Sequence, residues 1–129
     1  MLPRLLFLLA FTPSALFAQT PPTPPRTLLQ TDLQGVPGQE AMVQIVNIPP
    51  GAATPKHIHP DGHEIVYVLE GETVVEIDGA ATKTFAAGEL VHIAPNVPHL
   101  GRNASTSASL KLLVMRIKDK TKPIMIPVK

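Results

Sequence analysis

Three of the five histidines lie in one short stretch, "HIHPDGHE", which runs from His57 to Glu64. His57 and His59 are two positions apart, so in an extended chain their side chains point to the same face. The Pro-Asp-Gly tripeptide that follows predicts a turn, because proline presets one backbone angle and glycine accepts the positive φ after it. The chain then returns as a strand that begins at Glu64. We therefore expect two imidazoles and one carboxylate to lie close enough to reach one ion.

A fourth candidate ligand is His99, in the stretch "NVPHLGRN", which can join the others only if the strands close into a barrel. Three imidazoles and one carboxylate suit Fe(II), Mn(II), Ni(II) or Zn(II), and these ligand types leave the choice open. Four ligands around an octahedral ion leave two positions free for a substrate or O₂. A site with one formal positive charge would accept an anionic or enolate-like ligand. The alternative is that histidines beside a turn are simply polar surface residues.

The remaining two histidines lie outside this set of four. His63 precedes Glu64 and should point to the opposite face, at the surface or just behind the ligands, unless a tighter turn lets it replace Glu64. His92 lies in the apolar run "LVHIA", which favours a hydrogen-bonded histidine in the core or pocket. Either Gln44 or Asn47 could face the pocket. Tyr67 is expected to serve packing alone.

Short apolar, β-branched runs separated by turn residues dominate the chain. We expect strands at 41–48, 64–71, 73–77, 82–85, 90–93 and 109–117, with a hairpin signal at Asp78-Gly79. Turn signals recur every eight to twelve residues or so, a spacing typical of a β-sandwich or barrel. Helical periodicity is lacking in the stretches that follow the first 18 residues. The sequence therefore predicts an all-β fold.

The first 18 residues have the layout of a secretory signal peptide, with Arg4, an apolar run from Leu5 to Phe11 and small residues before Gln19. We expect cleavage after Ala18, a proline-rich linker over residues 19–25 and one domain over residues 26–129. The exported protein would then be periplasmic or secreted, with no membrane span. An uncleaved membrane anchor is the alternative.

Composition excludes several classes of function. The 129 residues include no cysteine, so disulfides and thiolate metal sites are excluded. Without Arg4, ten basic and ten acidic residues balance, and a neutral protein has no long-range attraction for nucleic acid. The lysines at 118, 120 and 122 are expected to be solvated.

Around the histidine cluster the sequence resembles the cupin superfamily. The first family motif reads Gly51, five residues, His57-x-His59, four residues, Glu64, six residues and Gly71. The second runs from Gly88 through His99 to Asn103 with the family's overall spacing. It departs from the pattern in two places: Ala94 and Pro95 shift the usual proline by one position, and Asn96 replaces a glycine. Asparagine tolerates positive φ better than most residues, so the turn should survive.

The resemblance implies a short double-stranded β-helix, the jelly-roll barrel of cupins, with a divalent ion inside. It implies the metal ligands His57, His59, Glu64 and His99, a small-molecule substrate or ligand, and a homodimer. Dioxygenase-like chemistry is our leading expectation, because it needs the fewest additional protein groups. A non-catalytic ligand-binding protein, a metal-dependent isomerase or hydrolase, and a barrel with a vestigial site are the alternatives.

Overall fold

The structure is a computed structural model that describes residues 23–129. The predicted signal peptide, its cleavage after Ala18 and the first part of the proline-rich linker lie outside the described residues. Within residues 23–129, none of the chain forms a helix long and apolar enough to cross a membrane.

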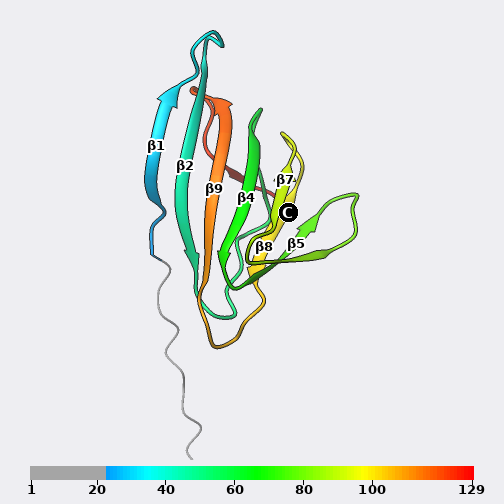
Figure 1. Ribbon diagram of the computed structural model, residues 1–129. Helices are drawn as coiled ribbons and strands as arrows, with labels where there is room; N and C mark the ends of the chain where they lie inside the picture. The colour runs from blue at the N-terminus through cyan, green and yellow to red at the C-terminus, as the bar shows by residue number, and fades with distance from the viewer. Residues whose placement is uncertain (1–22) are drawn as a thin grey trace, which may run out of the picture.

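The described chain forms ten strands in two five-stranded sheets, all of whose neighbouring strands are antiparallel (Figure 1). The first sheet contains, in spatial order, β1 (Arg26–Asp32), β2 (Gln39–Ile48), β9 (Leu110–Asp119), β4 (His63–Glu70) and β7 (Leu90–Ile93). The second contains β10 (Ile126–Pro127), β3 (His57–Ile58), β8 (His99–Asn103), β5 (Glu72–Ile77) and β6 (Lys83–Ala86). This is the expected double-stranded β-helix, and the all-β prediction is confirmed.

The core lies between the two sheets and follows from the alternation of apolar residues along the strands. In β4 and β9 every second side chain points inward, so Val66, Val68, Leu112 and Val114 are buried in one cluster. Val75 of β5 joins them from the second sheet. The same alternation decides which polar side chains are carried into the barrel and which remain outside it.

The sequence analysis missed two substantial strands, β1 and β8. All seven residues of β1 are exposed at the edge of the first sheet, so this strand lacks the alternation that reveals a half-buried strand. β8 reads "HLGRN", where a glycine and polar residues conceal a strand that pairs with β5. Lys118 is a further correction, because its ammonium is buried 3.0 Å from the Glu40 carboxylate rather than solvated.

Asn103 connects the end of β2 to the loop after β8, at one end of the barrel. Its buried amide donates hydrogen bonds to the carbonyls of Ile48, Pro49 and Ala108 at 3.1, 3.2 and 2.8 Å, respectively. Its carbonyl oxygen accepts the Ser105 N–H at 2.9 Å. This side chain therefore joins residues 48–49, at the end of β2, to the loop that follows β8.

We expect Asn103→Ala to lower the free energy of unfolding by about 2–4 kcal/mol, because it leaves buried backbone carbonyls without donors. Asn47→Ala is the matched control, since Asn47 is exposed on β2 and the loss should stay within about 0.5 kcal/mol. Urea unfolding measures both values. Equal losses in the two variants would contradict the role given to Asn103.

Candidate metal centre

The four candidate ligands come from three segments that the fold brings to one place. His57 lies in β3 and pairs directly with His99 of β8, and their ring centroids are 4.3 Å apart. His59 follows β3, and Glu64 is the second residue of β4 in the opposite sheet. The centre is therefore enclosed between the two sheets, and all four side chains are buried.

Two tight turns, one at Asp61 and one at Asn96, hold the loop after His59 against the loop before His99. Asp61 and Asn96 both have positive φ, 51° and 64°, and the Asn96 amide donates to the Asp61 carboxylate at 3.0 Å. The Asp61 N–H donates back to the Asn96 side chain at 3.2 Å, and the Asn96 N–H reaches the His59 carbonyl at 3.1 Å. Positive φ was expected at Asn96, but in the first turn it falls on Asp61 rather than on Gly62. Gly62 instead lies close to β9: an added Cβ would be 3.1 Å from the Lys118 Cβ, so a larger residue would require Lys118 to shift slightly.

Hydrogen bonds fix the orientation of each imidazole. The ligand atoms of the four residues lie within 4.8 Å of one another. The Nδ1 of each of these three histidines contacts a backbone carbonyl and is therefore the protonated nitrogen, which leaves the Nε2 lone pair free. The partners are Pro55 for His57 at 2.7 Å, Ile124 for His59 at 2.5 Å and Val97 for His99 at 2.9 Å.

The unpaired atoms of the centre fit a divalent cation. His59 Nε2 lies 2.9 Å from one Glu64 oxygen, and His99 Nε2 lies 3.6 Å from the other. Both Nε2 atoms are buried without a hydrogen-bond partner. With Nδ1 protonated, each lone pair faces a carboxylate oxygen, and two acceptors this close repel unless a positive charge lies between them. A cation ligated by both groups removes that repulsion and satisfies the orphaned nitrogens.

The titrating groups are in the forms that a metal ion needs. Burial on its own raises the pKa of Glu64, but the polar groups around the carboxylate, among them the Arg116 guanidinium, outweigh it and hold that pKa well below 4.5. Burial lowers the pKa of His57 below 6.5, although the Pro55 carbonyl opposes the change. Glu64 is therefore ionised and His57 neutral near pH 7, as ligation requires.

Arg116 is the residue of this centre that the sequence analysis missed. It pairs with Glu64 across the β4–β9 ladder, and its guanidinium lies 2.6 Å from a Glu64 oxygen. A second guanidinium nitrogen donates to the Gln44 carbonyl oxygen at 2.8 Å, and the Gln44 amide donates to Thr27 at 3.1 Å. The alternation of side chains along the strand could have identified it, because Arg116 is two residues beyond Val114 and so lies on the inward face of a core strand. Between Gln44 and Asn47, Gln44 is the one that points inward, while Asn47 is exposed.

A cavity of about 180 Å³ opens beside the candidate ligands. It is smaller than the roughly 300–1,000 Å³ typical of pockets for drug-sized ligands. The arrangement therefore suits a ligand of few atoms. Its walls are largely aliphatic, and the lining includes His57, Glu64, His99, Arg116, Val46, Ile48, Val66, Val75, Ile93, Leu112 and Val114.

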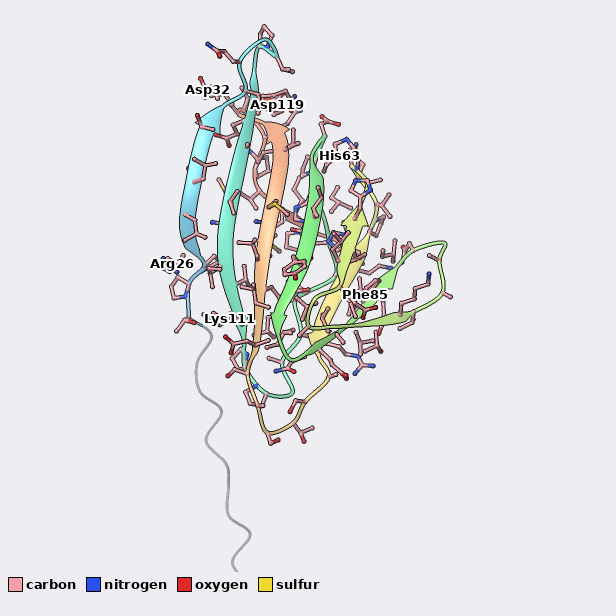
Figure 2. The ribbon with its side chains drawn as sticks, in the orientation of Figure 1. Arg26, Asp32, His63, Phe85, Lys111 and Asp119 are labelled. Atoms are coloured by element: carbon pink, nitrogen blue, oxygen red, sulfur yellow. The ribbon has the colours of Figure 1, made fainter. Side chains whose placement is uncertain are left out.

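The other two histidines pair with each other outside the barrel. Both are exposed, their rings stack with centroids 5.2 Å apart, and His63 Nδ1 lies 2.9 Å from His92 Nε2. Figure 2 shows His63 at the start of β4, at one end of the first sheet. The pocket or core position expected for His92 is therefore wrong. Val91 and Ile93 take the inward positions of β7, so alternation turns His92 to the outer face.

Comparisons with known proteins agree with this fold. The family model for the cupin domain matches residues 44–116. A solved structure from Thermus thermophilus is 26% identical with a TM-score of 0.61, and the match covers 74% of this chain and 82% of that one. Comparison with curated proteins finds no match.

Two longer enzymes share the fold over part of their length. An oxalate oxidase is 25% identical, with a TM-score of 0.59 and coverage of 68% of this chain and 46% of its own. The DMSP lyase of Ruegeria pomeroyi is 23% identical, with a TM-score of 0.59 and coverage of 68% and 43%. This chain spans less than half the length of either enzyme.

Proposed function

Because the chain belongs to the cupin superfamily, we propose that it is a metal-dependent cupin that acts on a small organic molecule. His57, His59, Glu64 and His99 would hold one divalent ion, Fe, Mn, Ni or Zn. One observation carries the proposal: two buried imidazole Nε2 atoms face the Glu64 carboxylate with no hydrogen-bond partner. A divalent ion is the simplest group that satisfies all of these atoms together.

Dioxygenase-like chemistry is the reaction class we favour. The bound ion would supply open coordination positions for substrate and O₂. Apart from the candidate ligands, Arg116 is the one ionisable side chain among the described residues that line the cavity. An isomerase or hydrolase needs a general acid or base, and a guanidinium is a poor one because it does not readily give up a proton. The similarity to an oxalate oxidase supports an oxidative reaction as well.

The second candidate function is binding of a small chelating ligand without turnover. The small, largely aliphatic cavity favours this function as much as the first, because it offers few groups for proton transfer. Both functions need the same metal and the same ligands, so metal content alone does not separate them.

O₂ uptake separates the two functions. The Fe(II)-loaded protein would be mixed anaerobically with small 1,3-diketones, catechols and 2-hydroxy acids, and O₂ consumption followed after air is admitted. We expect one of these classes to raise O₂ uptake above that of the zinc-loaded protein, which cannot change oxidation state. Tight binding of a compound with no uptake by the iron form would favour the binding protein instead.

We also propose that the protein is exported to the periplasm or beyond. The support is the signal-peptide layout of residues 1–18. Mass spectrometry of the natively produced protein should find an N-terminus near Gln19, and a retained Met1 would contradict export by cleavage.

A homodimer is the assembly we propose, formed through the outer face of the first sheet. Apolar side chains meet there in cross-strand rows: Val43 with Met115 and Ile65, and Leu113 with Tyr67 and Leu90. Leu90 is 57% exposed and Ile117, on the same face, 42%. A contiguous apolar face of this kind marks an interaction surface. Sedimentation equilibrium should give twice the chain mass, and Leu90→Lys should shift it toward the monomer.

A further inference from the structure

We propose that the cavity takes a small anionic ligand whose carboxylate is bound by Arg116 beside the metal. This inference rests on the proposed metal centre and names the class of compound that the centre accepts. It gives Arg116 a role in ligand selection beyond its contact with Glu64.

The charge of the loaded centre calls for an anion. Without an ion, the Glu64 carboxylate and the Arg116 guanidinium balance each other at 2.6 Å. A divalent ion held by neutral imidazoles raises the local charge to a formal +2. The surrounding walls are mostly aliphatic, so little protein polarity or solvent offsets that charge. A dianion neutralises it completely, a monoanion halves it, and a neutral ligand leaves it uncompensated.

Arg116 has unused N–H groups that could bind such an anion. A guanidinium carries five N–H groups, and the contacts with Glu64 and Gln44 use one from each terminal nitrogen. Its Nε is buried without a hydrogen-bond partner. The planar arrangement of these donors matches the two oxygens of a carboxylate.

The guanidinium is also held in place before any ligand arrives. Glu64 contacts it on one side, and Gln44, itself hydrogen-bonded to Thr27, contacts it on the other. Its side chain is 12% exposed and lines the cavity. Among the described residues that line this cavity it is the one cationic side chain, so the preference for anions depends on this residue and the metal together.

Three nearly isosteric compounds test the inference: oxalate, oxamate and oxamide, which carry two, one and no negative charges. Their affinities for the zinc-loaded protein would be measured by isothermal titration calorimetry, and zinc content would be checked after each titration. We expect Arg116→Met to weaken oxalate binding about 10–100-fold, the range for lost charged hydrogen bonds, and to change oxamide binding less than about threefold. The readout is the change in the oxalate-to-oxamide affinity ratio between wild type and variant. The metal alone also prefers oxalate, so the wild-type preference by itself does not test Arg116.

Arg102→Met is the matched control. Arg102 carries the same charge, but its side chain is 48% exposed on β8, 3.9 Å from Glu76. Removing it should leave the oxalate-to-oxamide affinity ratio within about threefold of the wild-type value, because an exposed charge is screened by solvent. An equal drop in both variants would overturn the inference, since it would reflect net charge rather than Arg116.

Two further results would overturn it while leaving the metal centre intact. One is a zinc-loaded Arg116→Met protein with the wild-type oxalate-to-oxamide ratio, and the other is a wild-type protein that binds oxamide as tightly as oxalate. If Arg116→Met does not retain zinc, Arg116→Lys is used in its place. This variant keeps the positive charge but loses the planar pair of donors. An oxalate-to-oxamide affinity ratio equal to the wild-type value would again overturn the inference. A wild-type protein that binds no zinc would instead refute the proposed function.

Discussion

His99→Ala should remove most of the bound metal, whereas His63→Ala should leave the metal content at the wild-type level. His99 is buried, and its free Nε2 points at Glu64 inside the barrel. His63 is exposed on the outer face and hydrogen-bonded to His92. Loss of groups that merely support metal ligands typically weakens affinity 10–100-fold, so loss of a ligand should weaken it by roughly 100-fold or more.

The measurement is elemental analysis of untagged protein purified without added metal, which also identifies the ion. The two variants are well matched, because each loses one imidazole and no other group. Circular dichroism should show the wild-type β spectrum for both, which separates metal loss from unfolding. Equal metal contents in the two variants would refute the proposed ligand assignment.

The local part of the site could be predicted from sequence because short-range rules govern it. The two-residue spacing of His57 and His59 places both on one face, and a turn returns the chain at Glu64. The inclusion of His99 depended on closure of the barrel, which the family resemblance implied and the β3–β8 pairing shows. Asn96 could be judged an acceptable replacement for glycine because its backbone preference is known, and its φ is 64°.

What could not be predicted depends on register between distant strands. Arg116 matters because β4 and β9 pair with Glu64 opposite Arg116, and no local pattern specifies that alignment. Lys118 looked like one of three solvated lysines, yet the β2–β9 register places it opposite Glu40, where the two bury as an ion pair. The prediction for His92 was wrong for a related reason. Its apolar neighbours suggested burial, but they occupy the inward positions of β7, so the His92 side chain points outward.

Metal removal should lower the melting temperature substantially, because the empty centre keeps unfavourable contacts that the ion relieves. In the apoprotein the buried Nε2 atoms of His59 and His99 face the Glu64 carboxylate without partners. Each such buried atom costs about 1–3 kcal/mol.

The same effect can be calculated from mass action. An ion that binds only the folded chain, at a free concentration about 100 times its Kd, stabilises that chain by about 2.7 kcal/mol. For a domain of this size, that corresponds to a rise of roughly 10–20 °C in melting temperature.

Calorimetry before and after chelation, with metal content verified in each sample, measures the shift in melting temperature. Re-addition of the ion should restore the original value. In His99→Ala the shift on chelation should largely disappear, because the site no longer couples metal binding to folding. A melting temperature unchanged by verified metal removal would mean that the four side chains hold no ion in the folded protein, and the proposed function would fail with them.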